Sequence, residues 1–198
     1  LWKPEKRGQH VERDAAAYEV DRLIGVNVVP PTFVRDMNGQ KGFIQGFAGA
    51  SDLKALGRGG DKRNSIDADD WKRVAVLDYV IDNRDRHGRN LRVAKVGNRY
   101  RLRAIDHTMS IGTEFDSSNM LAIQAVHRRR GVWGDKLPAD VAAKVKSLTR
   151  DTLGTRLGKS LAKDQVDRIW DRVQNVQRLG LSALWDRPLR GYRAPRRV

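Results

Sequence analysis

Cysteine is absent from the 198 residues of this chain, and long apolar runs are absent as well. Without cysteine the chain can form no disulfide, and it can use neither a thiol nucleophile nor a cysteine-ligated zinc site. No apolar run approaches the roughly 20 residues that span a bilayer, and the first residues lack the pattern of a signal peptide. We therefore expect a cytoplasmic protein with no transmembrane segment.

Acidic residues are few relative to basic ones. The chain has 39 Lys and Arg residues against 24 Asp and Glu residues, which gives a net charge of +15 and an isoelectric point near 10.6. Such a charge favours nonspecific binding of polyanions at low salt. The Arg-rich regions, 127–130 and 186–198, are interpreted either as a solvated cationic surface or as contacts for nucleic acid or an anionic membrane face.

Apolar periodicity divides the chain into helices and strands. Helical spacing of apolar residues predicts helices in the segments 13–24, 66–81, 141–148 and 166–176. The β-rich runs on either side of an Asn-Gly turn predict a hairpin within 32–47. A second strand pair is expected at 90–96 and 99–105. This order of elements indicates an α+β chain in two lobes, the second of them mostly helical.

The most informative segment is the loop 82–90, with the sequence DNRDRHGRN, which follows a helix and precedes a strand. Loops held between rigid elements often display functional groups. Within this loop Asp85 lies five positions before Asn90, and Asp106 ends the second strand that follows. Carboxylate and amide oxygens are hard ligands, which Mg²⁺ binds while keeping waters and phosphate oxygens in its shell. The pattern therefore predicts that Asn90 and Asp106 bind Mg²⁺.

Phosphoryl transferases divide the work among similar residues. One Asp accepts the proton of the attacking hydroxyl, while an Asn and a second Asp hold the metal against the phosphates. Asp85 fits the first role, and Asn90 and Asp106 fit the others. Arg86 is assigned to the catalytic loop beside Asp85, either to contact phosphate or to order the loop, and we favour the second role. The alternative for the loop as a whole is a salt-bridged turn.

A resemblance to known kinases extends beyond this loop. The segment 76–86, followed by Asn90 and then by 104–106, resembles the phosphatidylinositol 3- and 4-kinase-like superfamily, closest to type II phosphatidylinositol 4-kinases and their bacterial relatives. HipA-type kinases and Golgi secretory-pathway protein kinases share the same broad pattern. The resemblance covers about residues 1–115. It implies a protein-kinase-like fold and the use of ATP and Mg²⁺.

The resemblance also implies a nucleotide site. The Trp2-Lys3-Pro4 run is similar to the strand that bears the nucleotide-binding lysine in these kinases. The helix position that carries the glutamate partner of this lysine is occupied by Asp14, with Glu12 as a substitute. The segment 43–47 looks like the hinge, whose backbone would bind adenine. The residues expected to bind nucleotide are thus Lys3, Glu12, Asp14, Gln45, Gly46 and Phe47.

The expected organisation follows from this resemblance. We expect a partial N-lobe at 1–47, because the family's glycine-loop strands are not seen before Lys3, then a helical C-lobe at 48–185 and a basic tail at 186–198. The implied reaction is transfer of the γ-phosphoryl group of ATP to a hydroxyl. A protein Ser/Thr is the first choice of acceptor, because no membrane-inserting apolar loop is evident, and a phosphoinositide is the second. The alternative is a catalytically impaired kinase-like module that binds nucleic acid or an acidic partner.

Overall fold

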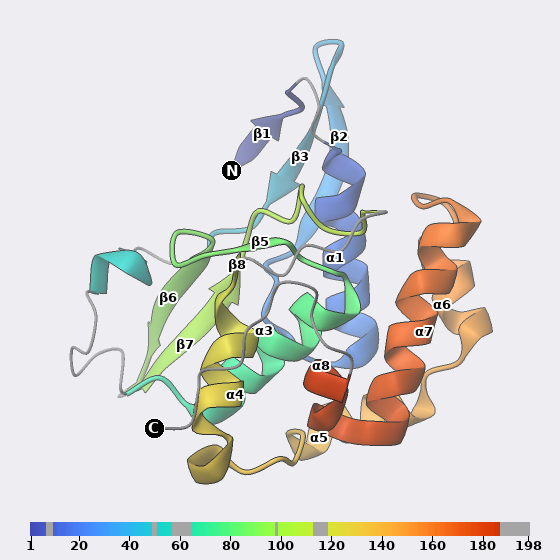
Figure 1. Ribbon diagram of the computed structural model, residues 1–198. Helices are drawn as coiled ribbons and strands as arrows, with labels where there is room; N and C mark the ends of the chain where they lie inside the picture. Colours follow the sequence, from blue (N-terminus) through green and yellow to red (C-terminus); the bar gives the residue numbers. More distant parts are fainter. Residues whose placement is uncertain (7–9, 49–50, 57–64, 98, 113–118, 187–198) are drawn as a thin grey trace.

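The computed structural model describes residues 1–6, 10–48, 51–56, 65–97, 99–112 and 119–186 (Figure 1). The expected basic tail, from residue 187 on, lies outside the described residues. The helices are α1 (Val11–Ile24), α3 (Ala68–Val80), α4 (Leu121–Trp133), α5 (Ala139–Ser147), α6 (Arg150–Leu157), α7 (Lys163–Leu179) and α8 (Ala183–Asp186), with short 3-10 turns η1 (Lys54–Leu56) and η2 (Gly180–Ser182). The strands are β1 (Trp2–Pro4), β2 (Thr32–Met37), β3 (Gln40–Gln45), β4 (Ser51–Asp52), β5 (Asp85–Arg86), β6 (Leu91–Val96), β7 (Arg99–Ala104) and β8 (Asn119–Met120).

The first part of the chain forms an antiparallel sheet in the order β1-β3-β2, with α1 packed alongside it (Figure 1). The predicted hairpin is present as β2 and β3. Its turn residues Asn38 and Gly39 have φ values of 55° and 74°, the positive values that a tight hairpin turn of this kind requires. In this sheet Lys3 on β1 is paired with Phe43 on β3. The sheet thereby fixes where the side chain of Lys3 begins.

Helix α1 ends at Gly25, whose φ of 74° permits the left-handed cap that a residue with a Cβ disfavours. The buried carboxylate of Asp21 then accepts hydrogen bonds from the backbone nitrogens of Val28 and Val29, at 2.7 and 3.0 Å. These bonds fix the direction in which the chain leaves the helix toward β2. The helix predicted at 13–24 is confirmed, and it begins two residues earlier.

A second antiparallel sheet has the order β4-β6-β7, and its strand β7 packs against α3. Strands β6 and β7 form the expected pair, in a register that places Leu91 opposite Ala104. The short strands β5 and β8 form a separate parallel pair. Because β6 begins next to Asn90 and β7 ends just before Asp106, the register of this one hairpin brings both predicted metal ligands to the same end of the sheet.

Helix α3 runs through the centre of the hydrophobic core (Figure 1). It begins after Asp67, whose carboxylate caps the backbone nitrogen of Asp69 at 2.9 Å. Its apolar residues are buried all round, against α4, α7 and the second sheet. Helix α7 covers it with a stripe of buried residues at helical spacing, Val166, Ile169, Val173 and Val176. None of the described helices is both long and apolar enough to span a membrane.

Candidate active site

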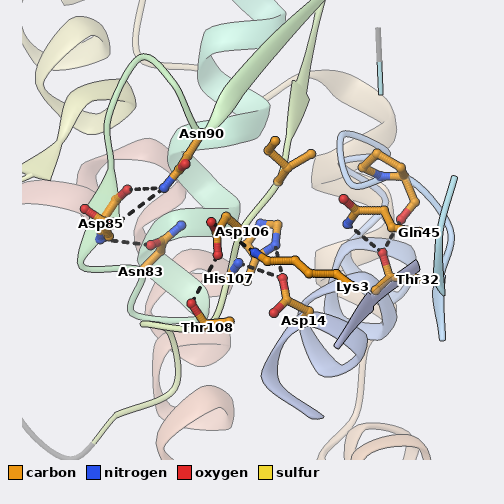
Figure 2. Close-up of polar contacts among 12 residues, drawn as sticks. Lys3, Asp14, Thr32, Gln45, Asn83, Asp85, Asn90, Asp106, His107 and Thr108 are labelled. Atoms are coloured by element: carbon orange, nitrogen blue, oxygen red, sulfur yellow. Dashed lines mark hydrogen bonds and ion pairs between the residues drawn. The ribbon is translucent and has the colours of Figure 1, made fainter. Parts of the chain in front are cut away.

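Lys3 and Asp106 meet where the first sheet faces the end of β7 (Figure 2). The Nζ atom of Lys3 lies 3.3 Å from Oδ2 of Asp106, and each side chain is about one third exposed, at 30% and 35%. Lys3 Nζ also lies 5.6 Å from the centre of the Phe43 ring. The predicted nucleotide lysine and the predicted metal ligand are therefore neighbours, and both remain accessible.

The turn after β7 holds Asp106 in an uncommon conformation. Its φ of 57° lies in the left-handed region, which costs free energy for a residue other than glycine. Oδ1 of Asp106 accepts a hydrogen bond from the hydroxyl of Thr108 at 3.1 Å. The backbone nitrogen of His107 donates to the buried carboxylate of Asp14 at 2.8 Å. Helix α1 thus holds the turn that presents Asp106.

The predicted pairing of Lys3 with Asp14 or Glu12 is not found among the described residues. Glu12 forms an ion pair with Lys41 instead. Asp14 contacts His107, whose Nδ1 lies 3.7 Å from its Oδ1, and both side chains are fully buried. Burial lowers the pKa of His107, so the imidazole stays neutral near pH 7. Spacing could not predict this arrangement, because the choice of partner depends on how the turn packs on α1.

The loop before β6 presents Asp85 (Figure 2). The Nδ2 atom of Asn90 donates to the backbone oxygen of Asp85 at 3.0 Å and to its Oδ2 at 3.3 Å. The backbone nitrogen of Asp85 donates to Oδ1 of Asn83 at 3.0 Å, and His87 Nε2 lies 3.6 Å from Asp85 Oδ2. The carboxylate of Asp85 is held from both sides but stays 38% exposed. It can therefore receive a proton from an incoming group.

Arg86 is fully buried and cannot contact a substrate. Its Nε lies 3.1 Å from both carboxylate oxygens of Asp78 on α3. One terminal nitrogen donates to the backbone oxygens of Asn90 and Ile105, at 2.6 and 2.8 Å. Arg86 therefore orders the loop, the role that the sequence favoured, and its assignment as a catalytic residue is corrected to that of a positioning residue. Asp78, its anchor, was missed because nothing in its helical sequence marks it.

The expected hinge lies at the end of β3. The side chain of Gln45 is buried and donates from Nε2 to the hydroxyl of Thr32 at 2.9 Å. The backbone of Gln45 pairs with Leu1 in both directions, and the nitrogen of Gly46 donates to the oxygen of Pro31 at 2.8 Å. Phe47 is 87% exposed. The backbone beyond Gly46 is thus the part of this segment best placed to meet a ligand.

Asn90 and Asp106 have the chemistry that a divalent cation needs. The Ile105 nitrogen donates to the Asn90 oxygen at 3.1 Å, which keeps the two predicted ligands close. The amide nitrogen of Asn90 is hydrogen-bonded to Asp85, so its amide oxygen is left as a hard ligand. The carboxylate of Asp106 already balances the charge of the Lys3 ammonium. No cluster of three or more His, Cys, Asp or Glu side chains suited to a metal occurs in the described part of the chain. A metal here would depend on oxygens of a bound phosphate or on water.

Comparisons with known proteins identify the fold. No protein-family model matches the sequence, and no curated protein matches it. The structure is similar to a solved structure described as "crystal structure of the Golgi casein kinase with Mn/ADP bound", with a TM-score of 0.59 and 14% sequence identity. The similarity covers 98% of this chain and 71% of that chain. The chain therefore has an α+β, protein-kinase-like fold with a small N-terminal lobe, which confirms the fold class predicted from the sequence.

Proposed function

We propose that this chain is an ATP-dependent kinase that transfers the γ-phosphoryl group to a hydroxyl. The observation that carries the proposal is the convergence of part-exposed polar groups within a kinase-like fold. Lys3 lies against Asp106, and the backbone of Asn90, which holds Asp85, is bonded to the residue before Asp106. A salt-bridged turn alone would not require a lysine from a distant strand at the same place.

In this proposal Lys3 binds the α- and β-phosphates of ATP. Its pairing with Asp106 would be exchanged for pairing with the phosphates, whose charge it would balance. Asp14 is favoured over Glu12 as the carboxylate that orients Lys3, because its Oδ2 atom is buried without a hydrogen-bond partner, whereas Glu12 is paired with Lys41. Within the expected hinge, Gln45–Phe47, the backbone beyond the nitrogen of Gly46 would bind adenine, because the backbone groups of Gln45 are already paired.

Asn90 and Asp106 would hold a divalent cation, for which we propose Mg²⁺. Bound there, the cation would neutralise charge on the phosphates. The neighbour's structure holds manganese with ADP, so Mn²⁺ is the ion to compare with Mg²⁺. Asp106 would contribute a carboxylate oxygen and Asn90 its amide oxygen, while the Thr108 hydroxyl keeps the carboxylate of Asp106 in place.

Asp85 would act on the acceptor. The acceptor oxygen would attack the γ-phosphorus, the bond from that phosphorus to the β–γ bridging oxygen would break, and ADP would leave. The proton of the acceptor hydroxyl would pass to the carboxylate of Asp85. Asn90 would keep this carboxylate directed toward the acceptor through its amide nitrogen.

A protein Ser/Thr is our first choice of acceptor, and a phosphoinositide is the second. The name of the similar structure, a casein kinase, favours a protein acceptor. The basic character of the chain suits acidic acceptors of either kind, since opposite charges raise the rate of encounter.

The test is ATP turnover by the purified chain, with labelled phosphate followed into casein and into phosphatidylinositol vesicles, with Mg²⁺ or Mn²⁺. We expect turnover to be lost in Asp85→Asn and in Asp106→Asn. Asp135→Asn is the matched control, because Asp135 is exposed and lies in the loop between α4 and α5. Equal turnover in all four proteins would overturn the proposal.

A binding module remains the second candidate, because Arg128, Arg129 and Arg130 are exposed together near the end of α4. Such a cluster can bind a polyanion without any catalytic step. This candidate predicts no turnover, no change in melting temperature on adding ATP, and salt-dependent binding of RNA or an acidic peptide that weakens when these arginines are replaced with Gln.

A further inference from the structure

Several arginine side chains gather around one buried carboxylate, on the side of the catalytic loop that leads into Asp85. Asp82 is 2% exposed, and its Oδ2 lies 3.5 Å from Arg84 and 3.3 Å from Arg172 on α7. Arg168, one turn earlier on α7, also acts on Asp82 electrostatically. Burial raises the pKa of Asp82, and the charges of these arginines oppose that effect.

Positive charge exceeds negative charge here. Arg13 on α1 lies near Arg84, and its pKa is lowered, first by burial and then by the charge of Arg84. Arg168 is paired with Asp164 at 2.8 Å. We call Arg13, Arg84, Arg168 and Arg172 the arginine cluster. Among the described residues, Asp82 forms ion pairs with Arg84 and Arg172, and Asp164 forms one with Arg168. Glu12 also acts electrostatically on Arg13, and Tyr79 on Arg172.

Part of the cluster lacks hydrogen-bond partners. Nε of Arg84 and one terminal nitrogen of Arg168 are buried without an acceptor among the described residues, and Oδ1 of Asp82 is buried without a donor. Buried unpaired donors are costly, so further acceptors would stabilise the cluster. The side chains of Arg84 and Arg172 are each 18% exposed, and that of Arg168 is 32% exposed. An anion can therefore reach the exposed part of these side chains from solvent, although the two unpaired nitrogens are themselves buried.

The cluster is in contact with the candidate active site. Arg84 directly precedes Asp85. Its guanidinium lies against Gly112, where a Cβ would be 2.9 Å from a terminal nitrogen. Arg13 donates to the backbone oxygen of Thr108 at 3.1 Å, and Gln165 on α7 donates to that of Ile111 at 3.3 Å. Two members of the cluster, Arg13 and Arg84, thus contact the segment that follows Asp106.

We propose that the arginine cluster binds a dianionic phosphate group, at a site separate from Lys3 and Asp106. Guanidinium groups match phosphate oxygens with paired hydrogen bonds, and several of them converge here with too few carboxylates. A bound phosphate would join α1, the loop before Asp85 and α7 through shared hydrogen bonds. Its source is either free phosphate or a phosphorylated side chain.

The experiment is phosphate binding to the purified full chain, without nucleotide or metal. Inorganic phosphate and O-phosphoserine are titrated separately at constant ionic strength, and the melting temperature and the heat of binding are measured. We expect a saturable rise in melting temperature. Arg84→Gln should raise the dissociation constant for phosphate by roughly tenfold to a hundredfold, since a hydrogen bond between charged groups is lost. Stronger binding of O-phosphoserine than of phosphate would indicate a phosphorylated side chain as the source.

Three further variants make the result specific. Arg168→Gln should also weaken phosphate binding, and it serves as the second variant because Arg168 forms its ion pair with Asp164 rather than with the buried Asp82. Arg99→Gln should bind phosphate as the unchanged chain does, because Arg99 is an exposed arginine on β7. Lys3→Met should also retain binding. The proposal would be overturned if phosphate binding were lost in Lys3→Met alone, or if Arg99→Gln weakened it as much as Arg84→Gln does. It would also be overturned if the unchanged chain showed no saturable phosphate binding. These outcomes hold whatever the kinase assay shows.

Discussion

Lys3 and Asp106 lie 103 positions apart in the sequence, yet their charged groups are 3.3 Å apart in the structure. The pair joins the first sheet to the turn after β7. Each partner is held independently, Lys3 by the pairing of β1 with β3 and Asp106 by Thr108 and by the contact of its turn with Asp14. Because the pair is not needed to place either residue, its partners are available to a ligand.

Replacing Lys3 with Met should therefore separate stability from function. Both side chains are about one third exposed, so we expect the free energy of unfolding to change by less than about 1 kcal/mol. ATP turnover should fall by at least roughly a hundredfold, because a group that stabilises phosphate charge is removed. Urea denaturation and ATP turnover of the same preparation measure the two effects. A large loss of stability would show instead that the lysine is structural.

Asp85→Asn should impair the chemical step while nucleotide still binds. The amide keeps an acceptor for Asn90 Nδ2 but cannot take a proton, so turnover should fall by roughly a hundredfold to ten-thousandfold. The dissociation constant for ATP, measured by calorimetry, should stay within about twofold of that of the unchanged chain, because Asp85 is not among the proposed nucleotide or metal ligands. Normal turnover in this variant would remove Asp85 from the proposed mechanism.

Local signals explain what the sequence predicted of the fold. The Asn38-Gly39 turn and the acids at the start of α3 act through the residues next to them, so the hairpin and the helix were both found. The strands β5 and β8 are two residues long and exist only because distant segments meet, so no periodicity reveals them. Helix α4 was also missed, since its basic end, with Arg128 to Arg130, weakens the apolar pattern.

The candidate site was predictable where it depends on spacing along the chain. Asp85 and Asn90 belong to one short loop, so their closeness follows from their separation, and the structure adds the hydrogen bond between them. Their roles in catalysis stay a prediction. The partners of Lys3 and Arg86 were not predictable in the same way. Lys3 pairs with Asp106, which lies far away in the sequence. Arg86 pairs with Asp78, and both side chains are buried in the core. Which carboxylate a long basic side chain reaches is decided by packing.

Arg86→Met should destabilise the fold strongly. Arg86 and Asp78 are both fully buried, and removing one partner leaves an uncompensated buried charge. We expect a loss of roughly 3–5 kcal/mol in the free energy of unfolding, measured by urea denaturation. The matched control is Arg99→Met, which breaks the exposed pair with Asp67 and should cost less than about 1 kcal/mol. Similar losses in both variants would contradict the positioning role of Arg86.

Asp21→Asn should stabilise the chain at neutral pH and not at acidic pH. Burial raises the pKa of Asp21 from its usual 3.8 to about 6, against the opposing effect of hydrogen bonds from Val29 and Val28. Between these two pH values the folded state holds more protons than the unfolded state. The free energy of unfolding therefore falls as pH rises through this window, and the unfavourable contribution is fully present above pH 6.

Asparagine keeps an oxygen acceptor for the Val28 and Val29 nitrogens but does not ionise. Relative to the unchanged chain, the variant should gain up to about 3 kcal/mol in the free energy of unfolding as pH rises from about 3 to about 7, most steeply between about pH 4 and pH 6. Urea denaturation of both proteins at steps of one pH unit measures this difference. The opposing titration of the buried His107, whose pKa burial lowers, is common to both proteins and cancels in the subtraction. A difference that is constant with pH, or that grows toward acid, would mean that Asp21 is ionised in the folded chain throughout this range.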